Sequence, residues 1–346
     1  MPRRLPRRLS VLALSVVATV ALSACSSAST DGAGDEDADA LVIYNAQHEK
    51  LTEEWADAFT EETGIAVVLR NGGDSELGNQ LVAEGDASTA DVFLTENSPA
   101  MSLVENAGLL APVESATLQT VPEAYRPASG DWTGIAARST VLVYNPSLID
   151  EADLPASLMD LQDPEWKGRW GAAPSGADFQ AIISAMLQTQ GSEATATWLD
   201  AMNANAEIYN NNIATMKAVN AGDVPVGVIY HYYWYRDQDG TKENSGNTEL
   251  HYFGNQDPGA FVSVSGGAVL KNATHPEEAQ KFLAFLTRTE GQRILGEGYS
   301  FEYPVASDVP ANPALPALDT LDAPAIDPST LNGPDVIQLM IDAGLL

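Results

Sequence analysis

Short apolar runs alternate with amphipathic stretches in the first part of the chain after residue 40. The apolar runs predict strands, because each is short and bounded by polar or turn-forming residues, and the amphipathic stretches predict helices. In order, these elements are a strand at 41–44, a helix that ends before Gly64, a strand at 65–69, a helix at 75–84, a strand at 91–95 and a helix at 98–107. Such alternation predicts a mostly parallel sheet in an α/β protein.

Polar residues follow two strands of this predicted sheet. His48 comes after the first strand, and Glu96 comes directly after the third. Ligands of such sheets bind beyond the carboxyl ends of the strands. We therefore expect both side chains at the same edge of the sheet, on one side of a binding site.

The same pattern continues in a second region and then returns to the first. In order, the predicted elements are strands at 140–144 and 170–173, a helix at 179–187, a segment at 209–212 leading into a helix at 214–221, an apolar strand at 224–229, an apolar stretch at 259–270 and one amphipathic helix at 279–295. Strand 140–144 is predicted to enter a second lobe, and 259–270 to leave it. Two crossings imply two lobes joined by a hinge, with a cleft between them.

The lobe boundaries follow from these crossings. We assign residues 41–138 and 264–305 to lobe 1, and residues 139–263 and 306–346 to lobe 2. A chain of this length suffices for two domains of ordinary size, each with its own core.

A polar turn precedes the helix at 179–187. Ser175, Gly176 and Ala177 lie where the helix begins. The start of a helix offers unpaired N–H groups and a positive dipole end, so these residues could cradle an anion. Ordinary capping of the helix by Ser175 explains the same pattern.

The densest run of chemically active side chains is the segment 230–235, which contains four tyrosines and a histidine and follows the apolar strand 224–229. Neighbouring side chains of a strand point to opposite faces, so Tyr232 and Tyr233 can share a site only where the strand ends and the backbone turns. A trivalent, oxygen-seeking cation would favour such phenols once their protons are lost. Core packing or a stacking platform is the alternative interpretation.

The N-terminal segment predicts export. Four arginines precede an apolar stretch that ends at Cys25, which is typical of a lipoprotein signal peptide at residues 1–24, followed by a Ser, Gly and Asp tether at 25–40. Cys25 is the single cysteine of the chain, so we interpret it as the lipid attachment point, and no intramolecular disulfide is possible. We therefore expect an extracytoplasmic protein on the cell membrane.

Charge and motifs narrow the function further. The formal net charge of −31 becomes more negative once the signal arginines are removed, which argues against nucleic acid as a partner. The chain contains no phosphate loop, no nucleophile elbow and too few cysteines for a zinc finger. His251 and His275 are typical of surface or capping residues, and nothing in the sequence assembles a Ser-His-Asp enzyme.

Three segments together carry a family resemblance. They are YNAQH at 44–48, ADVFLTE at 90–96 and YYWY at 232–235, with further agreement at 256–260, 265–270 and the C-terminal 342–345. In this order and spacing they resemble the bacterial ferric ion-binding proteins of ABC iron importers, over nearly the whole mature chain. The resemblance implies a class II periplasmic-binding-protein fold.

The resemblance also implies a ligand set for one Fe³⁺. His48 and Glu96 would come from lobe 1, and the adjacent Tyr232 and Tyr233 from lobe 2. Glu96 and two phenolates would offset the 3+ charge of the ion, whereas unperturbed tyrosine stays protonated at neutral pH. Because the ligands come from both lobes, the ion should favour closure.

A synergistic anion is implied as well. It would rest on the helix start at Ser175, Gly176 and Ala177 and on Asn212. This chain has Tyr230 where the family has a second asparagine, and a phenol donates only one hydrogen bond, so carbonate, citrate or another anion could replace phosphate. Arg138 could pair with an anion or a carboxylate, and we favour a structural role for it.

These observations predict a lipid-anchored, monomeric solute-binding protein that captures Fe(III) and delivers it to the permease of an ABC importer. It would perform no covalent chemistry. A solute-binding protein for an oxyanion or phosphonate is the first alternative, with the tyrosines as aromatic side chains of the cleft. A secreted metal-dependent hydrolase is the second, and it would require Glu96 to leave the metal and act as a base.

Overall fold

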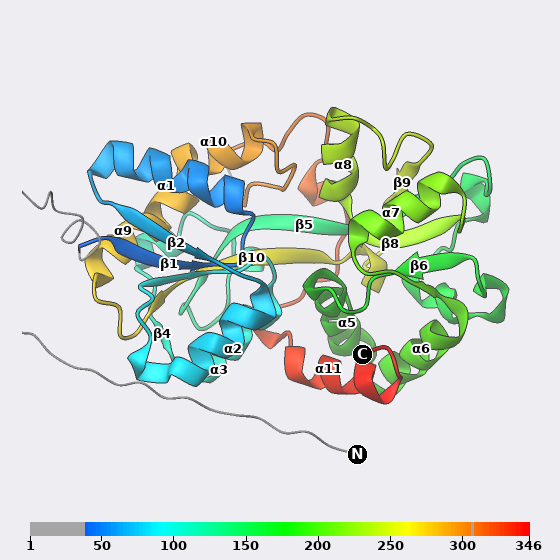
Figure 1. Cartoon of the computed structure of the whole chain (residues 1–346), viewed down its shortest axis with the longest axis horizontal. Helices are drawn as coiled ribbons and strands as arrows, with labels where there is room; N and C mark the ends of the chain where they lie inside the picture. The colour runs from blue at the N-terminus through cyan, green and yellow to red at the C-terminus, as the bar shows by residue number, and fades with distance from the viewer. Residues whose placement is uncertain (1–38, 306–307) are drawn as a thin grey trace, which may run out of the picture. The chain divides into compact units, whose positions relative to one another are not determined.

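Strand β5 (Thr133–Tyr144) joins the two halves of one mixed sheet. In the computed structural model, which describes residues 39–305 and 308–346, β5 pairs antiparallel with β10 (Val262–Leu270) as far as Ser139, and from Thr140 with β8 (Val226–Tyr230). The order of strands is β2-β1-β3-β10-β5-β8-β6-β7 (Figure 1). The predicted crossings at 140–144 and 259–270 are therefore confirmed.

The first half of the sheet follows the predicted alternation. It contains β1 (Leu41–Asn45), α1 (Glu49–Thr63), β2 (Val67–Asn71), α2 (Asp74–Glu84), β3 (Val92–Leu94), α3 (Ser98–Asn106) and the short β4 (Leu110–Ala111). Strands β1, β2 and β3 are parallel, whereas β10 runs antiparallel to β3, so the sheet is less parallel than predicted. Gly64 ends α1 in the left-handed conformation, as the sequence predicts.

The second half repeats the strand, turn and helix unit. Its elements are β6 (Trp170–Ala172), α5 (Ala177–Gln190), α6 (Ser192–Asn205), β7 (Glu207–Ile208), α7 (Asn212–Ala221), β8, α8 (His231–Asp239) and β9 (Glu249–His251), with α11 (Gly333–Asp342) returning near the C-terminus. Strands β6, β7 and β8 are parallel. Helices α5, α6 and α11 cover one face, and α7 lies against the other (Figure 1).

Separate apolar cores support the two halves. In the first half, α1 and the helical residues 276–297 pack on one face of the sheet through Trp55 and Phe282. Helices α2 and α3 pack on the other face through Leu81 and Met101. In the second half, one large cluster contains α5 and α6, and it also includes Ala137 and Tyr303 at the crossing. The exact lobe boundaries stay a prediction, because core residues at the crossing contact both halves.

The single helix predicted at 279–295 is wrong. The chain forms α9 (Pro276–Thr287) and α10 (Thr289–Glu297), because Arg288 between them is extended, with a ψ of 171°. At Gly291, an added Cβ would lie 2.3 Å from the carbonyl oxygen of Phe285. A close approach of two backbones thus replaces the continuous helix that the hydrophobic pattern indicates.

The predicted signal peptide, Cys25 and most of the tether lie outside the described residues. Within residues 39–305 and 308–346, no helix combines the length and the apolar character that a membrane span requires.

Candidate metal centre

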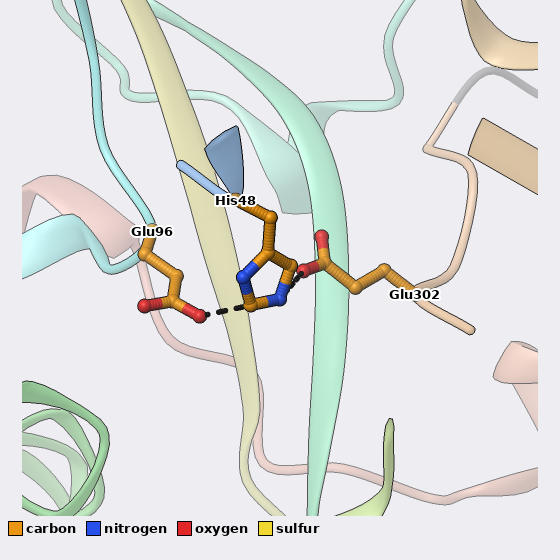
Figure 2. Close-up of side chains that lie close together, drawn as sticks. All are labelled: His48, Glu96 and Glu302. Carbon is orange, nitrogen blue, oxygen red and sulfur yellow. Dashed lines mark ion pairs between the residues drawn. The ribbon is translucent and has the colours of Figure 1, made fainter. Parts of the chain in front are cut away.

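His48 and Glu96 lie together beyond the carboxyl ends of β1 and β3. His48 is the residue that precedes α1, and its Nε2 lies 3.5 Å from Oε1 of Glu96. The same nitrogen lies 3.0 Å from Oε1 of Glu302, a residue that the sequence analysis did not select (Figure 2). One ligand atom from each of the three side chains lies within 4.8 Å of the others. The expectation that His48 and Glu96 share one edge is confirmed.

Tyr232 and Tyr233 reach this edge from the second half of the sheet. Strand β8 ends at Tyr230 and α8 begins at His231, so both tyrosines lie in the first turn of a helix. Their rings stack, with centroids 4.1 Å apart. The Tyr232 hydroxyl donates to Oε1 of Glu96 at 2.9 Å, and the Tyr233 hydroxyl donates to Oδ2 of Asp178 at 3.0 Å. The strand therefore ends where a shared site requires it to end.

Asp178 is the central acceptor that the sequence analysis missed. It is the second residue of α5, and it is buried. Asn97 donates to its Oδ1 at 2.9 Å, and Asn212 donates to its Oδ2 at 2.7 Å. An acidic residue in the first turn of a helix is usually explained by the helix dipole. Its position directly after the proposed anion cradle is the signal that could have identified it.

One of the residues predicted to bind an anion contacts this carboxylate, and the others lie near it in the chain or in the hydrogen-bond network. Asn212 contacts Asp178 directly, and the Tyr230 hydroxyl lies 3.5 Å from Oδ1 of Asn97. The N–H of Gly176 donates to the carbonyl of Ala173 at 3.1 Å, while the side chain of Ser175 is exposed. Ala177 is the first residue of α5. A protein carboxylate thus meets part of the donor set that the sequence assigns to an exogenous anion.

Buried charges lie behind the ligand candidates in the first half. The guanidinium of Arg138 contacts Oε1 of Glu96 at 3.0 Å and Oε1 of Glu302 at 3.1 Å. Asp74 accepts hydrogen bonds from the backbone N–H of Glu96 and from the side chain of Asn97. The sequence analysis allows either an anion or a carboxylate as the partner of Arg138, and in the structure its partners are carboxylates.

The electrostatics keep protons on the phenols. Burial, and then the charges of Asp178 and Glu96, raise the pKa of Tyr232 and of Tyr233 well above its usual range. Burial and the charge of Glu96 raise the pKa of Asp178 to about 6. A cation that enters this site must therefore displace protons from the tyrosines.

The pKa values of Asp74 and Glu302, two buried carboxyl groups close to Glu96 and His48, shift in opposite directions. Burial and the charge of Glu96 raise the pKa of Asp74 to about 8. For Glu302, burial opposes ionisation, but Arg138 and His48 outweigh it and lower the pKa to about 2. Glu302 is thus a permanent anion at neutral pH, and Arg138 is its buried counter-charge.

A cavity of about 990 Å³ lies away from these side chains. Its lining includes residues 123–130, 318–319 and 322–328 together with Val262 and Val264 of β10, and it includes none of the predicted ligands. The ligand candidates instead contact one another directly. The chemistry of the side chains, rather than the size of a cavity, identifies the site.

Imidazole, carboxylate and phenol groups from both halves of a two-lobed α/β fold define a solute-binding protein whose solute is a hard cation. The chain matches the family described as bacterial extracellular solute-binding protein over residues 54–323. It is 57% identical over 336 residues to the Fe(3+)-binding periplasmic protein of Serratia marcescens, covering 97% of this chain and 99% of that protein. The chain belongs to the bacterial ferric ion-binding proteins, whose members are solute-binding proteins and not enzymes.

Solved structures agree with this assignment. Iron-bound HitA from Pseudomonas aeruginosa is 45% identical and superimposes with a TM-score of 0.82, covering 88% of this chain and 99% of that one. The Trichodesmium protein IdiA, solved with iron and citrate, is 29% identical with a TM-score of 0.78, covering 89% of this chain and 100% of that one. The two-lobed fold predicted from the sequence is confirmed.

Proposed function

We propose that this protein captures Fe(III) between its two lobes, with His48, Glu96, Tyr232 and Tyr233 as ligands. The observation that carries the proposal is that the hydroxyls of Tyr232 and Tyr233 converge on the carboxylates of Glu96 and Asp178, at 2.9 and 3.0 Å. The names of the relatives from Serratia marcescens and Pseudomonas aeruginosa support iron as the cargo.

Oxygen-rich donors suit this cargo. Carboxylates and phenolates are hard, anionic ligands, and a 3+ ion stabilises the phenolate form that burial otherwise disfavours. The two phenol protons now occupy hydrogen bonds to carboxylates, so the ion would replace these protons and keep the carboxylates as neighbours. Iron uptake would release the protons to solvent.

Asp178 changes the expected role of the synergistic anion. We propose that its carboxylate supplies negative charge next to the ion, because Asn212 and Tyr233 already donate to it. Phosphate, carbonate or citrate would then fill only a remaining position near Ser175, Gly176 and Ala177. Loose selectivity among these anions follows, and citrate is the anion found in the Trichodesmium structure.

The cellular part of the proposal concerns export and delivery. The protein would be attached to the outer face of the cell membrane through a lipid on Cys25, act as a monomer and deliver iron to the permease of an ABC importer. Mass spectrometry of protein extracted from membranes should show a lipid on Cys25, and Cys25→Ser should remove this modification without changing iron affinity. Mature wild-type protein without the lipid would contradict the anchor.

The decisive test is metal and phosphate analysis of protein purified without added chelator, together with its visible spectrum. We expect one iron per chain and a charge-transfer band from tyrosinate bound to Fe(III). A colourless protein that binds an oxyanion or phosphonate with no metal would favour the first alternative. A colourless zinc protein that hydrolyses esters would favour a hydrolase.

A further inference from the structure

Glu302 is a buried carboxylate that neither the sequence patterns nor the proposed ligand set assigns. It lies after α10, on a segment that runs beside β5, where the backbone of Tyr303 exchanges hydrogen bonds with Ala137. Its side chain is fully buried. Oε2 accepts a hydrogen bond from Gln47 at 3.2 Å, and Oε1 contacts His48 and Arg138. A buried charge with this many partners is held in one geometry.

The segment that carries Glu302 is fixed from both sides. Phe301, the residue before it, has a φ of +55°, which is uncommon for a residue other than glycine. The carbonyl of Phe301 contacts Nε2 of His231 at 2.8 Å, and Nδ1 of the same ring accepts from the N–H of Ser139. The backbone of the segment is therefore attached both to the crossing strand and to the start of α8, which carries the tyrosines.

Arg138 links Glu302 to the proposed ligand Glu96. Its side chain is fully buried, and one guanidinium nitrogen lies 3.0 Å from Oε1 of Glu96 while the other lies 3.1 Å from Oε1 of Glu302. Glu96 is the more accessible of the two carboxylates, at 20% exposure against 0%. Glu302 is thus the fully buried ion-pair partner of Arg138, whereas Glu96 is partly accessible at the site.

We propose that Glu302 is a positioning residue for iron capture, which acts by neutralising Arg138 so that the carboxylate of Glu96 stays available to the metal. This inference rests on the proposed function. Without Glu302, Glu96 is the one ion-pair partner that Arg138 keeps among the described residues, so the guanidinium competes with the cation for the carboxylate of Glu96. Removing one partner of a buried ion pair is costly for this reason, whereas replacing both by neutral groups is often close to neutral.

A positioning residue and a direct ligand respond differently to the loss of Arg138. A ligand supplies its own oxygen to the metal, and removing Arg138 does not restore that oxygen. A positioning residue that acts through Arg138 becomes dispensable when Arg138 is also neutral. The double variant therefore distinguishes the two roles.

The test compares Glu302→Gln with the double variant Arg138→Met/Glu302→Gln in the full chain, using Fe(III) titration against citrate and the visible band. We expect Glu302→Gln to weaken Fe(III) binding by about 10- to 100-fold, the effect typical of an outer-shell partner. The double variant should recover most of this loss. Urea unfolding of each iron-free variant reports its stability independently.

Asp91→Asn is the matched control. Asp91 is also a buried carboxylate of the first half, but it lies just before β3 and contacts Val42 and His275, at the opposite end of the strand from Glu96. Its replacement should lower stability and leave iron affinity unchanged.

The possible outcomes test the role of Glu302 and iron binding by the protein separately. Failure of the wild-type protein to bind Fe(III) would contradict the proposed function itself. Wild-type binding together with unchanged affinity in Glu302→Gln would overturn only the role of Glu302, as would a folded double variant that binds no better than the single one. If Glu302→Gln does not fold, iron binding by the double variant still supports the role, and its absence in a folded double variant rejects it.

Discussion

The chemistry of the site is set by a few side chains whose hydroxyls and carboxylates face one another. Tyr232 and Tyr233 hold their protons in hydrogen bonds to Glu96 and Asp178, and burial makes these phenols weak acids. An ion with high charge can displace the protons, whereas a weaker cation competes poorly with them. Selectivity for Fe(III) would therefore arise at the scale of single residues.

Replacement of either phenol should remove a direct ligand. Tyr232→Phe and Tyr233→Phe keep the stacked ring and lose only the oxygen, so we expect each to weaken Fe(III) binding by more than the roughly 10- to 100-fold cost of an outer-shell change. Citrate competition and the visible band measure this. Tyr235→Phe is the control, because its hydroxyl lies near Tyr252 and not in the site. Wild-type affinity and colour in both variants would show that the phenols are not ligands.

Asp178→Asn should make iron binding depend on an added anion. The substitution removes the negative charge but keeps a side chain of the same size beside Asn212 and Tyr233. We expect the variant to bind Fe(III) weakly alone and to regain affinity with phosphate or citrate, while the wild-type protein shows little dependence. Titrations of iron-free protein in the presence and absence of each anion check this. A strict phosphate requirement in the wild-type protein would contradict it.

Element boundaries bring these residues together. Helix α8 begins directly after β8, so two adjacent tyrosines point to one side, which a continued strand would prevent. Helices α1 and α5 begin next to His48 and Asp178 in the same way. Strand β5 pairs with both halves of the sheet and so fixes the position of the start of α1 relative to the starts of α5 and α8.

Close packing along β5 should tolerate no side chain at Gly134. An added Cβ would lie 2.1 Å from the carbonyl oxygen of Tyr125. Backbone atoms move at a high cost, so we expect Gly134→Ala to reduce the free energy of unfolding by roughly 1–3 kcal/mol or more. Gly254→Ala is the control, because nothing lies within 4 Å of its Cβ position. Equal urea midpoints for the two variants would show that β5 is not closely packed at Gly134.

Across the protein, two halves with largely separate cores share strand β5, which pairs with β10 in the first half and with β8 in the second. Each half contributes part of the proposed ligand set. Binding of the ion to these ligands would therefore stabilise the arrangement in which the halves meet, by the difference in its affinity for closed and open states. Release requires a change that weakens this affinity.

Acid should release the iron. The pKa values of Tyr232 and Tyr233 are raised, so both phenols are protonated in the iron-free protein from pH 8 to pH 5, and iron must displace their two protons. Burial lowers the pKa of His48, but the carboxylates of Glu302 and Glu96 outweigh burial and raise it, so iron also displaces a proton from the protonated imidazole. A fall in pH raises the concentration of the competing proton, so affinity should fall by about two to three decades per pH unit. Protonation of Asp178, with a pKa of about 6, steepens the fall below that pH. Competition titrations corrected for chelator protonation measure the slope, and a flat profile is the contrary result.

Features that depend on the local pattern of residues could be predicted from the amino-acid sequence. Alternation of apolar runs and amphipathic helices predicts the succession of strands and helices along the first half, and the position of His48 and Glu96 after their strands predicts their shared edge. The apolar run before Tyr232 and Tyr233 also predicts that a strand ends there, which lets the two adjacent tyrosines share one site. These predictions succeed because backbone geometry over a few residues dictates where such side chains emerge.

Contacts between charges that lie far apart in the chain depend on the complete fold. In the sequence, Asp178 is typical of an acidic residue in the first turn of a helix, and Glu302 lies outside the helices and strands. Both carboxylates are nevertheless buried against partners that lie far away along the chain. Arg138 connects Glu96 with Glu302, and no spacing along the chain predicts this contact. The physical reason is that a buried charge must find its counter-charge in space, and packing of the whole molecule, rather than local sequence, sets which one is within reach.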